Sequence, residues 1–464
     1  MRDRWWLRSS RSPPTRAGVR SGVEILFAIL VGALLIAVVA WAARPSFAFD
    51  SSLTVIVLAW AYYTLAVPLD LWLGFNVRGS QRLPDSDDPA LFGYVVDVVL
   101  YYVSFMAGVL ISYKTVGILQ GNSARPGGES RAGLMGLPGP NSVLPGWCAY
   151  LVAGLAVVVY WTIVETANRG LQEQSLREDA YLRSLSFLVE ISLGWVVWHI
   201  LNVDDARRAL RVLPAAAIVG LLTGARVYLG VAGLIYLLRY RIGLTLRARV
   251  ALVVGAGLAV VLWKVMYSQV SSVLLTGELL ELSDMVPNLG LAELEASDAW
   301  GYFIYFLREG SSPLWLGWSY VKLTLANLAP RALSGVESST LAVEYAMRMN
   351  PMFAEAPMGL GFSGLAEAWL NFGPLGPFAI GVVWGGAASL LDSRPRSLAF
   401  YVFAIMSARF FRSDFASLAK TWCVVFASAV LMVGIISRIL VRVSGEMRRG
   451  LAELPARPWH PTRR

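Results

Sequence analysis

Long apolar runs alternate with short charged segments along most of the chain, and this pattern predicts membrane-spanning helices. A helix needs about 20 mostly apolar residues to cross a bilayer core of about 30 Å. The runs lie approximately at residues 24–43, 52–74, 92–113, 145–167, 184–202, 212–224, 226–238, 250–268, 374–391, 397–410 and 416–438. The pattern therefore predicts an all-α, polytopic integral membrane protein with about 10–12 transmembrane helices.

The neighbouring runs 212–224 and 226–238 are short for two ordinary spans, because each covers only about 18–20 Å as a helix. They form either two short legs joined at residues 223–226 or one broken span. The broken span gives an even number of crossings and leaves both arginine-rich termini on one side of the membrane. Two separate legs give an odd number of crossings, so both termini lie on one side only if another helix is gained or lost elsewhere.

One long interruption of the apolar pattern, residues 269–372, carries more acidic than basic residues. Arginines gather instead near the two termini, and cytoplasmic segments are the ones that retain positive charge. We therefore expect a cytoplasmic N-terminus (1–23), a first transmembrane part (24–268), a large extracytoplasmic loop (269–372), a second transmembrane part (373–438) and a cytoplasmic tail (439–464). Residues 114–143 are rich in Gly, Pro and Ser and predict a flexible connection.

Composition supports this interpretation and excludes several functions. The chain is 56% hydrophobic and only 15% charged, whereas soluble domains are about 25% charged. The net charge of +9 comes from arginines at segment ends, which favours anionic lipid headgroups and not nucleic acid. Cys148 and Cys423 lie in apolar runs without metal-ligand spacing. The sequence contains neither a nucleotide-binding glycine loop nor a metal-ligand cluster, so we expect no cofactor or metal. The missing glycine loop also disfavours an ATP-driven pump.

Arginines beside membrane spans are candidates for binding an anion. Arg226 follows Gly224 between the two short runs and suits a lipid-linked diphosphate, unless it only extends to the membrane interface. Arg409 and Arg412 are three residues apart, so on a helix they would project side by side and hold one anion together. The alternative for Arg412 is a surface ion pair with Asp414.

The stretch GFSGLAEAWLNFGPLGPF, residues 361–378, brings the predicted outer loop back to the membrane. On a helix Glu367 shares a face with Ser363 and Asn371, before Gly373 and Pro374 break the helix. A carboxylate at the edge of an apolar site is a candidate general base. It is equally suited to brace the loop through hydrogen bonds, with Ser363 and Asn371 orienting an acceptor or supporting the structure.

Taken in order, these motifs resemble those of the O-antigen polymerases, also called oligosaccharide repeat-unit polymerases. The resemblance covers about residues 210–420 and is carried by TGAR (223–226), LGWSY (316–320), APR (329–331), GxGxSxxxExxxNFGxxG (359–376) and RxDF (412–415). The chain departs from the family at Ala225, where a serine is more usual. This change removes a hydroxyl beside Arg226 but keeps the arginine.

The resemblance implies a helical membrane glycosyltransferase of GT-C-like architecture. Such an enzyme lengthens surface polysaccharide at the outer face of the bacterial inner membrane, and its active site faces the periplasm or the cell exterior. It transfers the growing glycan from undecaprenyl diphosphate to a sugar hydroxyl of the incoming lipid-linked repeat unit. Arg226, Arg409 and Arg412 would bind the diphosphate, and Glu367 would act as base or orient the acceptor. Expected partners are lipid-linked oligosaccharides, membrane lipids, a chain-length regulator and a flippase.

Four other functions are alternatives for a chain of this kind. An O-antigen ligase would carry a histidine in its outer loop, and residues 269–372 contain none. A polyprenyl-phosphate-dependent glycosyltransferase would carry acidic residues in its first outer loop, where this chain has the single Asp50. A flippase or secondary transporter of lipid-linked oligosaccharide would place its charges around a central cavity at mid-depth. A membrane scaffold for a polysaccharide assembly complex would tolerate substitution of the polar clusters.

Overall fold

A computed structural model of the chain describes residues 51–73, 90–123, 146–169, 180–223, 227–240, 277–281, 316–328, 362–395 and 397–452, together with isolated positions elsewhere. Every element within these ranges is helical, and none of them contains a β-strand. The helices are α2 (Ser52–Leu73), α3 (Ala90–Ser123), α4 (Trp147–Arg169), α5 (Ala180–Asn202), α6 (Ala206–Leu210), α7 (Leu213–Thr223), α8 (Val227–Tyr240), α12 (Trp318–Leu328), α15 (Gly364–Phe372), α16 (Gly376–Asp392), α17 (Leu398–Arg409), α18 (Phe415–Leu418) and α19 (Ala427–Ala452). The all-α prediction is confirmed for this part of the chain.

The helices carry the apolar character expected of a membrane protein. Within the described ranges, three stretches are long and apolar enough to cross a membrane: Val98–Gly121, Gly364–Asp392 and Phe415–Val443. Shorter apolar helices occupy Ser52–Ala66, Trp147–Val159, Val227–Tyr240 and Leu398–Arg409. Large apolar side chains on these helices, such as Leu100 and Leu151, are exposed on the protein surface. Surfaces of this kind are stable against lipid and costly in water.

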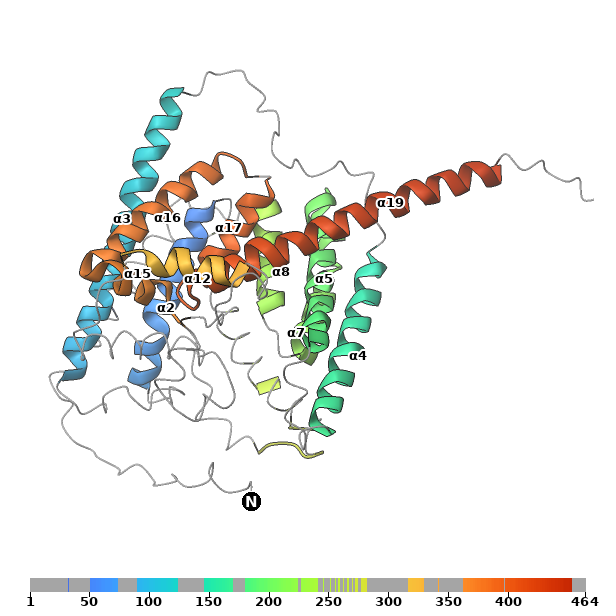
Figure 1. The fold of residues 1–464 in the computed structure, drawn as a ribbon, viewed down its shortest axis with the longest axis horizontal. Helices are drawn as coiled ribbons and strands as arrows, with labels where there is room; N and C mark the ends of the chain where they lie inside the picture. The colour runs from blue at the N-terminus through green and yellow to red at the C-terminus, as the bar shows by residue number, and fades with distance from the viewer. Residues whose placement is uncertain are drawn as a thin grey trace, which may run out of the picture.

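Helices α3 and α16 lie side by side along one flank of the bundle and form its most extensive contact (Figure 1). Glycines make this approach possible. A Cβ at Gly381 would collide with the carbonyl oxygen of Phe105, and one at Gly385 with that of Val109. Small residues at a helix interface let two backbones pack closely in a membrane, where apolar burial alone drives little association.

Helices α7 and α8 form a hairpin, which decides between the two arrangements of residues 212–238. Tyr240, the last residue of α8, donates its hydroxyl to the carbonyl oxygens of Ile200 and Val203 at 3.1 and 2.6 Å. Val212, just before α7, lies beside His199 across Gly146. The start of α7 and the end of α8 therefore both lie at the C-terminal end of α5. The two runs are separate legs and not one broken span.

Two predicted boundaries are wrong. Helix α3 continues to Ser123, so the first ten residues of the predicted connection 114–143 are helical. That part contains no proline, and the glycine- and proline-rich sequence begins only after it. The span predicted at 374–391 begins earlier, at Gly364, because α15 and α16 are joined by a single 3-10 turn, Gly373–Leu375.

Candidate functional site

The helix α15 begins and ends at residues that the sequence pattern suggests. The Ser363 hydroxyl accepts a hydrogen bond from the Leu365 amide at 3.2 Å and caps the helix. Gly373, with φ of 63°, ends it before Pro374. Gly364 has no room for a side chain, because an added Cβ would lie 2.5 Å from the Phe410 ring. Its amide also donates to the Phe410 carbonyl oxygen at 2.8 Å. Helix α15 is therefore fixed directly against the end of α17.

Glu367 is fully buried, and both of its carboxylate oxygens accept hydrogen bonds. The Ser319 hydroxyl of α12 donates to Oε1 at 2.7 Å. The backbone amide of Phe415 donates to Oε2, also at 2.7 Å. Hydrogen bonds to a carboxylate are about twice as strong as neutral ones. Glu367 therefore links α15 to α12 and to the start of α18.

Asn371 lies one turn further along α15 and fixes the turn that precedes α12. Its Oδ1 accepts from the backbone amide of Gly317 at 3.0 Å, and its Nδ2 donates to the Ser319 hydroxyl at 2.6 Å. The Asn371 carbonyl oxygen accepts from the amide of Leu316 at 2.9 Å. Leu316 and Gly317 have positive φ values of 48° and 85°, and a leucine adopts such a φ only at a cost. The contacts with Asn371 therefore maintain an unfavourable turn.

Asp414 forms a second buried junction. Its Oδ1 accepts from the Ser417 amide at 3.0 Å and caps α18, while its Oδ2 accepts from the amide of Leu341 at 2.9 Å. The side chain is fully buried. Asp414 thus connects the turn after α17 to a residue that is 73 positions away in the sequence. Asp414 therefore caps α18 and fixes Leu341 from inside the protein.

The turn between α17 and α18 is anchored by two adjacent phenylalanines. Phe410 stacks on Phe105 with ring centroids 5.2 Å apart, and Phe411 stacks on Tyr102 at 5.4 Å. Phe410 also packs against Trp384 at 4.6 Å. Insertion of both rings into the core ends α17 at Arg409 and fixes the path of the chain toward Asp414.

The expectation that Arg409 and Arg412 project side by side from one helix is wrong. Arg409 is the last residue of α17, and Arg412 lies in the following turn, where its amide donates to the Arg409 carbonyl oxygen at 3.0 Å. Both side chains are half-buried. The Nε atom of Arg409 is buried and has no hydrogen-bond partner among the described residues. Arg226, the third predicted arginine, lies outside the described ranges.

Helices α5 and α8 supply a carboxylate and a hydroxyl near Arg409. Tyr228 donates to Oε1 of Glu190 at 2.7 Å, and the second Glu190 oxygen is buried without a partner in the described structure. The Arg409 guanidinium is close enough to influence the Tyr228 hydroxyl electrostatically. The sequence offered little sign of this cluster, because its members are distant in the chain and share no spacing.

Two further polar groups lie unpaired on α12, one helical turn apart. The hydroxyls of Tyr320 and Thr324 are buried without a hydrogen-bond partner in the part of the chain that the structure describes. Burial raises the pKa of Tyr320 well above its ordinary value, and the nearby Glu367 carboxylate raises it further. The Tyr320 hydroxyl therefore stays protonated and is a hydrogen-bond donor. The four-residue spacing within SYVKLT is the only local signal for this pair.

The structure thus joins Glu367 and Asn371 of α15 to α12 through Ser319. Ser363 caps α15, Asp414 joins the turn after α17 to Leu341, and Arg409 ends α17. Within the described ranges, no group of three or more His, Cys, Asp and Glu side chains is arranged to hold a metal ion. The fold and the apolar helices define an all-α membrane protein. No family model, curated protein or solved structure matches the chain.

Proposed function

We propose that this protein polymerises lipid-linked oligosaccharide repeat units into surface polysaccharide at the outer face of the bacterial inner membrane. The growing glycan is transferred from undecaprenyl diphosphate to an acceptor sugar hydroxyl. The bond between the sugar and the diphosphate breaks, a new glycosidic bond forms, and the proton of the acceptor hydroxyl passes to the departing diphosphate. The departing diphosphate carries the bonding electrons, so the reaction needs neither nucleotide nor metal.

One observation carries this proposal. Three of the five motifs that carry the resemblance, at 316–320, 359–376 and 412–415, are far apart in the sequence, and their described residues meet in a single buried hydrogen-bond network. Ser319, Glu367 and the Phe415 amide form its centre, with contacts of 2.7 Å on both sides of the carboxylate. A set of motifs that converges in this way supports one shared site and not three independent structural features.

Arg409 is the residue to which we assign the main role in binding the diphosphate. Its buried Nε lacks a partner among the described residues, and a buried donor of this kind gains a strong bond when an anion arrives. Arg226 and Arg412 are assigned to the same anion on the basis of the resemblance. A positive group that faces the departing diphosphate would stabilise the charge that develops there.

Of the two roles expected for Glu367, the geometry supports bracing. Both oxygens are engaged, and the carboxylate would have to release Ser319 or the Phe415 amide before it could accept a proton from a sugar. We therefore assign Glu367 as a positioning residue that holds the turn carrying Arg412 and Asp414 against α12.

The proposal is tested by the length of surface polysaccharide in cells that lack this gene. Wild type, Arg409→Gln and Arg438→Gln are returned at matched membrane levels, Arg438 being an exposed arginine of α19. We expect a full polymer ladder with wild type and Arg438→Gln, and single repeat units with Arg409→Gln. A full ladder with Arg409→Gln would contradict the assigned site. Accumulation of unflipped lipid-linked repeats in the deletion strain would instead identify a flippase.

A further inference from the structure

A pocket of about 740 Å³ lies at the C-terminal end of α5, away from the network around Glu367. The start of α4, the end of α5 and the segment around α6 form its walls. The lining residues are Gly146, Trp147, Tyr150, His199, Asn202, Val203, Asp204, Asp205, Arg208, Arg211 and Val212. The volume falls in the range of about 300–1,000 Å³ that is usual for small-molecule sites.

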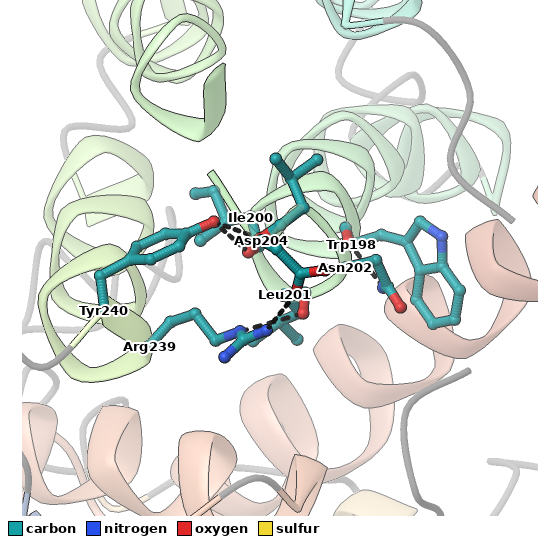
Figure 2. A network of polar contacts seen from close by, with 8 residues as sticks. Trp198, Ile200, Leu201, Asn202, Asp204, Arg239 and Tyr240 are labelled. Atoms are coloured by element: carbon teal, nitrogen blue, oxygen red, sulfur yellow. Dashed lines mark hydrogen bonds and ion pairs between the residues drawn. The ribbon is translucent and has the colours of Figure 1, made fainter. Parts of the chain in front are cut away.

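Side chains from α8 hold the C-terminal end of α5, which contributes His199 and Asn202 to the pocket lining (Figure 2). Tyr240 donates to the carbonyl oxygens of Ile200 and Val203, and Arg239 Nε donates to that of Leu201 at 3.1 Å. These carbonyls belong to the last turn of α5 and to the residue that follows it, where a helix leaves its acceptors unsatisfied. The hairpin of α7 and α8 therefore fixes the end of α5 in one position.

Asn202 is one of the lining residues, and its side chain has an acceptor that the described part of the protein does not use. Its Nδ2 donates to the Trp198 carbonyl oxygen at 2.8 Å, which fixes the orientation of the amide (Figure 2). Its Oδ1 is buried and has no partner in the described structure, and the whole residue is only 4% exposed. A buried acceptor without a bond costs about 1–3 kcal/mol. A ligand with a hydroxyl donor would remove that cost.

The pocket lining contains two arginines and two aspartates, and a third arginine, Arg239 of α8, pairs with one of these aspartates from outside the lining. Asp205 pairs with Arg208 at 3.5 Å, and Asp204 pairs with Arg239 at the same distance. Arg211 then adds a positive charge for which neither aspartate is available. The Tyr150 hydroxyl donates to the Arg211 carbonyl oxygen and fixes the backbone of this residue at the pocket wall.

We propose that this pocket binds a phosphate ester that also carries a hydroxyl group, with Arg211 and Arg208 contacting the phosphate and Asn202 Oδ1 accepting from the hydroxyl. The hydroxyl-bearing headgroup of an anionic phospholipid has this chemistry, and so does a soluble glycerol or sugar phosphate. Trp147 and Tyr150 at the rim are 60% and 39% exposed, and such aromatic residues are typical of the membrane interface. The site is independent of the proposed polymerase reaction.

Native mass spectrometry of the purified full-length protein tests the proposal with four probes. Phosphatidylglycerol supplies a phosphate and hydroxyls on a lipid, phosphatidic acid a phosphate alone, phosphatidylcholine a neutral headgroup, and glycerol 3-phosphate the soluble counterpart. We expect phosphatidylglycerol to bind about tenfold more tightly than the other two lipids. If glycerol 3-phosphate binds as tightly as phosphatidylglycerol, the ligand is a soluble phosphate ester. If glycerol 3-phosphate does not bind, the ligand is the lipid.

Three variants show whether the binding occurs in this pocket. Arg211→Gln should weaken phosphatidylglycerol binding about tenfold. Arg207→Gln changes a neighbouring arginine of α6 that does not line the pocket, and it should bind like wild type. Asn202→Ala should abolish the preference for phosphatidylglycerol over phosphatidic acid, with folding checked by thermal unfolding. Equal losses in Arg211→Gln and Arg207→Gln, or equal binding of all three lipids, would overturn the proposal.

Discussion

Gly364 is in contact with the ring of Phe410, and this contact makes a specific prediction about stability. The amide of Gly364 is held by the Phe410 carbonyl oxygen, so the backbone cannot move away from the ring. A methyl group at position 364 would overlap the ring edge. We expect Gly364→Ala to lower the free energy of unfolding by about 1–3 kcal/mol, the usual cost of overpacking. Thermal unfolding of the detergent-purified protein measures this loss.

Helix α8 offers a matched control for this substitution. An added Cβ at Gly230 meets nothing within 4 Å, so Gly230→Ala should leave the protein as stable as wild type or slightly more stable. The double variant Gly364→Ala/Phe410→Leu should recover part of the loss, because the smaller side chain leaves room. Equal stability of Gly364→Ala and wild type would show that the two elements are not packed as described.

Glu367→Gln tests whether this carboxylate braces the site. The amide has only one acceptor oxygen, so it cannot accept from both Ser319 and the Phe415 amide. We expect the free energy of unfolding to fall by about 1–3 kcal/mol, measured by chemical or thermal denaturation in detergent. Glu446→Gln, on an exposed face of α19, should change stability little. A Glu367→Gln protein that is inactive but fully stable would favour the general-base role instead.

Between elements, the pairing of α3 with α16 depends on which glycine faces the partner backbone. Gly385 lies against backbone atoms of Val109, which cannot yield, whereas a Cβ at Gly386 would meet the Ser112 hydroxyl at 3.1 Å, and that side chain can rotate. We expect Gly385→Ala to reduce the yield of folded protein strongly and Gly386→Ala to remain near wild type. Size-exclusion profiles of fluorescently tagged membrane extracts compare the two. Similar profiles would contradict the close packing.

The elements show how far the sequence could predict this fold. Apolar runs located most helices, because the length needed to cross a bilayer is a local property of the chain. The four-residue spacing of Glu367 and Asn371 indicated that they act together, but not that their common partner is Ser319, 48 residues from Glu367. The end of α17 agrees with the predicted run 397–410 to within one residue. The turn that takes Arg412 off this helix was missed, because it depends on Phe410 and Phe411 entering a core built from other helices. Contacts of this kind are tertiary and have no local signal.

For the whole molecule, a contact between two helix ends shows which helix ends lie on the same side of the membrane. The hydroxyl and amide of Ser52, at the start of α2, donate to Asp392 at the end of α16 at 2.6 and 2.8 Å. If residues 269–372 lie on the extracytoplasmic side, α16 ends on the cytoplasmic side, and the start of α2 lies on the cytoplasmic side as well. If α7 and α8 are two legs, the predicted runs give an odd number of membrane crossings, and the run 24–43 is the one that makes this number odd. That run lies outside the described ranges.

Cysteine labelling tests this arrangement directly. In a background without Cys148 and Cys423, single cysteines replace the exposed residues Arg207, Lys322 and Ser393. A membrane-impermeant maleimide should label Lys322→Cys in intact spheroplasts. It should label Arg207→Cys and Ser393→Cys only after the membrane is opened. Labelling of Arg207→Cys and Ser393→Cys from opposite sides would contradict the two-leg arrangement.

We propose that the molecule joins lipid-linked repeat units without a nucleotide. The most direct measurement incubates purified wild-type protein and Arg409→Gln with undecaprenyl-diphosphate-linked repeat units in proteoliposomes, without nucleotide or metal, and follows the products by mass spectrometry. We expect lipid-linked chains of two or more repeats and released undecaprenyl diphosphate with wild type, and neither with Arg409→Gln. Intact repeat units that only change leaflet, with no longer chain formed, would contradict it and identify a transporter.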